Sequence, residues 1–108
     1  MSKADVNIFG TTYSFELIDS PDDYMFDHYA DGYAEFDKKK ITVLAKRTET
    51  RRVVIHELIH AFLYESGHRQ KANDEDLVEL LTEIAERIAF ILKNQFDEVQ
   101  NDERNISC

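Results

Sequence analysis

Residues 50–67 read TRRVVIHELIHAFLYESG and carry apolar residues at helical spacing. Drawn as a helix, the stretch is apolar around most of its circumference, which is typical of a buried helix rather than a surface helix. Thr48 or Thr50 can cap its start, and Gly67 suits its end. We therefore predict a buried helix over residues 50–66.

His56, Glu57 and His60 interrupt this apolar run in the pattern HExxH. Residues four apart lie on one face of a helix, so both imidazoles can reach the same ion. Zinc accepts neutral imidazole and is usually held by four tetrahedral ligands. The carboxylate of Glu57 is then expected beside the open position of the metal, where it can take a proton from a bound water molecule. The pattern predicts Zn²⁺ as cofactor, His56 and His60 as ligands, and Glu57 as general base.

The competing interpretation of these three residues is a hydrogen-bonded cluster in the core. Buried without partners, two imidazoles and a carboxylate would cost several kcal/mol. The mid-helix position of the motif is the one that metal binding requires, which favours a metal site.

A second helix is predicted from Asn73 to about Phe96. Asn73 is a suitable N-cap, and the acidic residues that follow it suit the positive end of the helix dipole. The apolar residues of this segment form one stripe at helical spacing, which comprises Leu77, Leu80, Leu81, Ile84, Ala85, Ile88 and Leu92.

A catalytic zinc site needs a third protein ligand, because water takes the fourth position. The extended pattern HExxHxxGxxH fails, since Leu63 and Ser66 stand where it requires glycine and histidine. We prefer Glu79, which lies 19 residues after His60 on the second predicted helix. The competing candidates are His68, Glu75 and Asp76.

Glu83 follows Glu79 by one helical turn. This pair resembles the thermolysin-like arrangement, in which a glutamate ligand is followed four residues later by an acid that orients a motif histidine. A hydrolase also needs a donor to the oxyanion of its tetrahedral intermediate. Tyr64, at i+4 from His60, is the leading candidate for this catalytic role, and the alternatives are Tyr33, His28 and His68.

The first part of the chain favours β-structure. Residues 12–18 alternate as a half-buried strand does, and residues 6–9 are expected to pair with them across Gly10. Residues 32–36 and 40–44 flank a polar turn and predict a second hairpin. The aspartate-rich segment between these hairpins, residues 19–32, is predicted to be a loop.

The 108 residues carry a net charge of -9, with 43% hydrophobic residues and a single cysteine. This length favours one domain over residues 1–100, followed by a flexible tail over residues 101–108. Such acidity repels phosphate backbones and anionic lipid, so nucleic acid and membranes are not expected as partners. The lone cysteine and the absence of an apolar leader or spanning segment favour the cytoplasm.

The stretch from His56 to Gly67, followed by Asn73 to Glu79, resembles the small zincin-like proteins encoded by phages and prophages, which are grouped near the ImmA/IrrE metallopeptidases. The hairpin around residues 31–43 also resembles that group. The resemblance implies a minimal zincin of the α+β class, with a small antiparallel sheet packed on the active-site helix and the third-ligand helix. It also implies that a peptide substrate binds by adding a strand to the sheet edge above the metal.

Motif and resemblance together predict a zinc metallopeptidase that hydrolyses a peptide bond in a protein substrate, in a bacterial cytoplasm or the host cytoplasm of a phage. One alternative is a zinc-stabilised acidic binding or inhibitor protein with no turnover, because a small core gains stability from a structural metal. Another is a latent peptidase that is active only in a complex.

Overall fold

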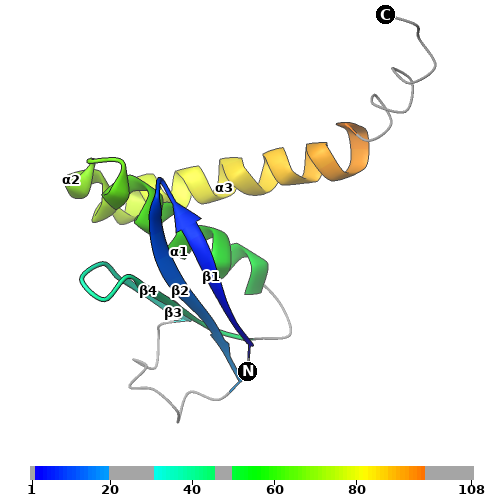
Figure 1. Cartoon of the computed structure of the whole chain (residues 1–108). Coiled ribbons are helices and arrows are strands. Elements are labelled where there is room, and N and C mark those ends of the chain that lie inside the picture. The colour runs from blue at the N-terminus through cyan, green and yellow to red at the C-terminus, as the bar shows by residue number, and fades with distance from the viewer. Residues whose placement is uncertain (1, 20–30, 46–49, 97–108) are drawn as a thin grey trace, which may run out of the picture.

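The computed structural model describes residues 2–19, 31–45 and 50–96, which form a four-stranded sheet and a layer of helices (Figure 1). The strands are β1 (Ser2–Ile8), β2 (Thr11–Ile18), β3 (Gly32–Glu35) and β4 (Lys40–Leu44). The helices are α1 (Thr50–Glu65), α2 (Arg69–Ala72) and α3 (Glu75–Ile91), and α3 continues into a π-helical segment, η2 (Leu92–Phe96). The predicted α+β class is confirmed.

The first hairpin forms where the sequence predicts it, but β1 is longer and begins at Ser2. Its two-residue loop consists of Phe9 and Gly10, and both have positive φ, 50° and 86°. Positive φ at both loop positions defines the type I′ turn, whose twist matches that of the flanking strands. The Asn7 side chain closes the turn by accepting a hydrogen bond from the Gly10 amide at 2.8 Å.

The sheet has the order β1-β2-β4-β3 and is mixed, which corrects the prediction of a wholly antiparallel sheet. β1–β2 and β3–β4 are antiparallel hairpins, whereas β2 and β4 pair in parallel. After β3, the chain turns back and β4 enters between β3 and β2, so β4 runs in the direction of β2. This order leaves β3 at one edge of the sheet.

Helix α1 confirms the first predicted helix and lies between the sheet and α3 (Figure 1). It ends at Glu65, and Gly67, two residues later, has a φ of 89°. The amide of Gly67 bonds the carbonyl of Tyr64, and the amide of His68 bonds that of Leu63. These two bonds form a Schellman motif, which favours glycine at the position of positive φ.

The second predicted helix is also present, with two differences at its start. A short helix that the sequence analysis did not predict, α2, precedes it. The N-cap is Asp74 rather than Asn73, because the Asp74 carboxylate accepts a hydrogen bond from the Leu77 amide at 3.1 Å. The chain is still leaving α2 at Asn73, so the extended backbone of an N-cap is first available one residue later.

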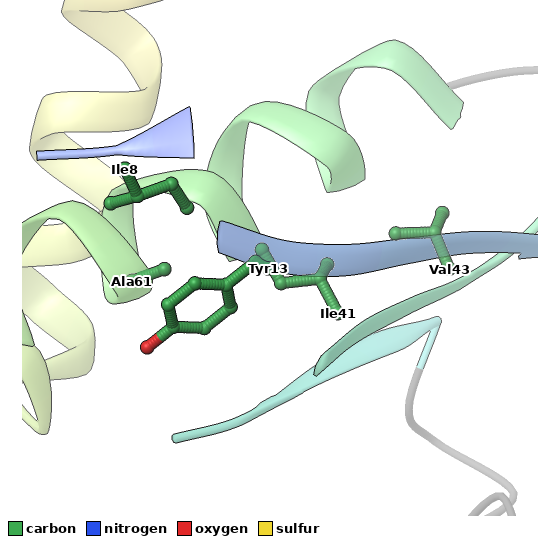
Figure 2. Close-up of a cluster of buried hydrophobic side chains, with 5 residues drawn as sticks. All are labelled: Ile8, Tyr13, Ile41, Val43 and Ala61. Atoms are coloured by element: carbon green, nitrogen blue, oxygen red, sulfur yellow. The ribbon is translucent and has the colours of Figure 1, made fainter. Parts of the chain in front are cut away.

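The core lies between the sheet and α1. Figure 2 shows its centre, with Ile8, Tyr13, Ile41 and Val43 from three strands against Ala61 of α1. All five residues are fully buried. This packing fixes one side of α1 against the sheet, so its other side, which carries the motif histidines, faces α3.

Within the part of the chain that the structure describes, no helix has the length and apolarity needed to cross a membrane. Of the loop predicted over residues 19–32, residues 20–30 with His28 lie outside the described residues, as do Thr48 and the predicted tail, and Gly32 is the first residue of β3.

Candidate metal centre

The two motif histidines occupy successive turns of α1 and point at the same space. Their Nε2 atoms are 3.2 Å apart, and the rings meet edge to face with centroids 4.9 Å apart. His60 is buried, and the side chain of His56 is 17% exposed. The i, i+4 spacing thus brings two potential ligand nitrogens together, as a helix must when both side chains turn to one side.

The third group at this position is the carboxylate of Glu75, in the first turn of α3. One oxygen, Oε2, lies 3.2 Å from His56 Nε2, and the other, Oε1, lies 3.1 Å from His60 Nε2. Each of the three residues offers a ligand atom within 4.8 Å of the others, and they form the one such group among the described residues.

The donor set and its spacing fit zinc. Two imidazole nitrogens and a carboxylate oxygen are common zinc ligands, and tetrahedral bonds of about 2.0–2.1 Å place neighbouring donors about 3.3 Å apart. The observed separations of 3.1–3.2 Å are close to this value.

The second nitrogen of each histidine faces an oxygen acceptor. His60 Nδ1 lies 2.5 Å from the carbonyl oxygen of Ala72. A carbonyl can only accept, so Nδ1 carries the proton and Nε2 keeps its lone pair. His56 Nδ1 lies 3.7 Å from Glu79 Oε1, which is beyond hydrogen-bond distance, on the side of the ring away from Glu75. Both rings are therefore oriented with their ligand nitrogens toward Glu75.

Glu79, the carboxylate that the sequence favours as third ligand, thus lies on the Nδ1 side of His56, whereas Glu75 lies on the Nε2 side. The position of α3 explains this arrangement. The helix begins at Glu75, so its first turn is closest to the histidines and Glu79 lies one turn further on. Asp76 and His68 are not members of the group, and His68 instead contacts the Ser66 hydroxyl at 2.9 Å.

Glu57 is buried, with an exposed fraction of 7%. Burial raises the pKa of its carboxyl to about 7, and the negative charge of Glu75 adds to the rise. A carboxylate of this kind exchanges its proton near neutral pH, which is the property of a general base or acid.

An open cleft of ≈570 Å³ exposes these groups between β3, α1 and the start of α3. It is lined by Asp31, Gly32, Tyr33, Ala34, Phe36, Arg52, Val53, His56, Glu57, His60, Asn73, Glu75 and Glu79. Gly32 brings the start of β3 against α1. A Cβ atom there would lie 3.0 Å from Val53 Cγ1 and 3.3 Å from Glu57 Cγ, so glycine permits this close approach.

Tyr64, the leading candidate for the oxyanion donor, is not among the residues that line the cleft. Its ring stacks on Phe36 at 4.3 Å, and Lys39 and Arg69 lie over it at 5.0 and 4.6 Å. Tyr33 of β3 does line the cleft.

Two groups near the histidines were not predicted from the sequence. Arg52 is one, and it lies one helical turn before His56 and hydrogen-bonds Glu79 at 2.9 Å. Its i−4 position was a usable signal, because it shares the face of α1 that carries His56. The other is the carbonyl of Ala72, which has no sequence signal because every residue carries a carbonyl.

Comparisons of the chain with protein-family models, with curated proteins and with solved structures found no match. What the protein does is therefore inferred from its own residues.

Proposed function

We propose that the protein is a zinc-dependent metallopeptidase in which His56, His60 and Glu75 hold the ion and Glu57 is the general base. The observation that carries the proposal is the meeting of two Nε2 atoms and a carboxylate at 3.1–3.2 Å, beside a buried glutamate in an open cleft. Hydrolysis at an HExxH site needs two histidine ligands, a third ligand to the metal and a glutamate that acts as the general base.

When bound, zinc would supply the Lewis-acid activation of a water molecule and of the scissile carbonyl. Glu57 takes a proton from the water molecule while the water oxygen bonds to the carbonyl carbon. The C–N bond then breaks, and Glu57 returns the proton to the leaving amine. Tyr33, which lines the cleft, is better situated than Tyr64 to donate a hydrogen bond to the oxyanion.

Glu75 and Glu79 support the proposal as a pair. Their spacing of four residues resembles the thermolysin-like arrangement of a glutamate ligand and a following acid, shifted one turn toward the N-terminus from the pair Glu79 and Glu83. In this pair, Glu79 faces His56 Nδ1 and orients the ring.

The proposed substrate is an extended segment of a protein. β3 is an edge strand, and three of its residues, Gly32, Tyr33 and Ala34, line the cleft. A peptide that pairs with this edge would run past Glu57 and the histidines, and the ladder hydrogen bonds would hold its backbone. We place the reaction in a reducing compartment such as the cytoplasm, consistent with a single cysteine.

The test is zinc content per chain by elemental analysis, on protein purified without a metal-affinity step, for wild type and for Glu75→Ala and Asp76→Ala. We expect about one zinc per chain in the wild type, loss of zinc in E75A and retention in D76A, whose carboxylate is outside the group. Zinc absent from the wild type after Zn²⁺ is supplied would refute the proposal. If zinc were retained in E75A but lost in Glu79→Ala, the third ligand would be Glu79, as the sequence predicts, and not Glu75.

Hydrolysis is tested separately with an unstructured casein and a mixed peptide library, analysed by mass spectrometry. Glu57→Gln should keep its zinc and lose at least about a hundredfold in rate, because the general base is removed. Equal cleavage by wild type and E57Q would rule out this mechanism. A wild type that binds zinc and cleaves nothing would favour the zinc-stabilised binding protein.

A further inference from the structure

We propose that Arg52 is a positioning residue of the metal centre, which acts on the ion through Glu79 and His56. The inference rests on the proposed function, because it concerns the same zinc site. It assigns a role to the one lysine or arginine among the described residues that line the cleft.

Arg52 connects α1 to α3 one turn from the histidines. Its Nη2 donates to Glu79 Oε2 at 2.9 Å, while Nη1 reaches Glu83 at 3.4 Å and also contacts Glu86. With Oε2 bound in this way, the other oxygen of Glu79 faces His56 Nδ1 at 3.7 Å. A hydrogen bond thus joins the guanidinium to the Glu79 carboxylate, and a longer electrostatic approach joins the carboxylate to the imidazole.

The charges on α3 explain why this link needs a cation. Glu75, Glu79, Glu83 and Glu86 follow one another at spacings of three or four residues, so their like charges repel. The planar guanidinium of Arg52 can bind several carboxylates at once in fixed directions, which a lysine ammonium does not do. Without Arg52, Glu79 would lose its hydrogen-bonded partner and turn toward solvent.

Arg52 also separates the roles of two neighbouring glutamates. It holds Glu79, which lies on the Nδ1 side of His56. Glu75 lies on the Nε2 side, and among the described residues no contact joins it to Arg52. Groups that orient a ligand in this way typically change metal affinity by about 10–100-fold when they are removed.

The experiment is a double-mutant cycle on zinc affinity, measured with the full-length chain by competition for Zn²⁺ with a chromogenic chelator. The variants are Arg52→Met, which keeps the apolar stem, Glu79→Gln, and the two combined. We expect R52M and E79Q each to weaken zinc binding by about tenfold or more, and the double variant to bind as weakly as E79Q and no weaker. Arg87→Met is the matched control, because Arg87 is 75% exposed and its hydrogen-bonding partner among the described residues is Glu83, not Glu79 or a histidine, so the affinity of R87M should equal that of the wild type.

Two results would overturn the inference. One is wild-type affinity in R52M, and the other is fully additive losses, which would mean that Arg52 acts without Glu79. Failure of the proposed function is a different result, since the wild type itself would then bind no zinc. Circular dichroism checks that each variant folds. If R52M does not fold, Arg52→Lys replaces it in the cycle, because the charge is kept and the planar fork is lost.

Discussion

Glu65 shows how much one side chain can organise away from the metal centre. At the end of α1, its carboxylate accepts hydrogen bonds from Tyr13 at 2.6 Å, Lys39 at 2.7 Å and Thr11 at 3.2 Å. These donors come from β2 and from the turn before β4. The residue therefore holds the C-terminal end of α1 onto both halves of the sheet.

We predict that Glu65 makes stability depend on pH. The hydrogen bonds from Lys39 and Tyr13 lower the pKa of its carboxyl. Because the folded pKa lies below the unfolded one, the contribution of Glu65 is full above the ordinary glutamate pKa of about 4.3 and is lost as the pH falls through the folded pKa. Glu65→Gln should therefore lower the urea midpoint at pH 7, and its difference from wild type should narrow in acid. Glu35→Gln is the control, since the exposed Glu35–Lys38 pair contributes little. A pH-independent difference would contradict the prediction.

At the scale of the element, the start of α3 decides which acid meets the histidines. The helix begins at Glu75 because Asp74 caps it and the preceding residues are still occupied by α2. Local sequence patterns predict that a helix exists here. Which residue caps it depends on the backbone conformation between α2 and α3. A shift of one residue would rotate each acid by about 100°, which is enough to turn Glu75 away from the histidines.

We predict that Asp74→Ala lowers the free energy of unfolding by about 1 kcal/mol, because the Leu77 amide loses its acceptor. The same change should weaken zinc binding, since Glu75 is the next residue. Asn73→Ala is the control and should be close to wild type in urea unfolding. If N73A lost stability and D74A did not, Asn73 would be the cap.

At the scale of the whole molecule, α3 divides its apolar residues between two surroundings. Val78 and Thr82 are fully buried, and α3 packs on α1. The predicted apolar stripe lies largely outside this contact, and Leu80, Ile84 and Ile88 are 56%, 43% and 52% exposed. The helical pattern of apolar residues is therefore broader than the face that the chain covers.

We predict that the buried and the exposed apolar residues of α3 contribute differently to the free energy of unfolding. Val78→Ala should cost about 2 kcal/mol, because two buried methyl groups are removed and a cavity remains. Ile88→Ala should change the free energy of unfolding by no more than about 0.5 kcal/mol, because the side chain is already half in water. Urea unfolding measures both changes. A large loss in I88A would mean that its face is covered in solution.

The sequence alone determined the features that depend on local geometry. The helix period brings His56 and His60 to one face, alternation and the Gly10 turn produce the first hairpin, and Gly67 ends α1 where positive φ is needed. Each of these follows from interactions within a few residues of the chain.

Only the tertiary structure decided the features that depend on distant residues. β4 pairs in parallel with β2, and Arg52 hydrogen-bonds Glu79, which is 27 positions further along the chain. Glu75 faces the histidines because α2 occupies the residues just before the cap, so that α3 begins at Glu75. Several acids on α3 offer the same chemistry at similar spacing. The choice among them depends on the packing of α3 against α1, since that packing sets which turn of α3 meets the motif.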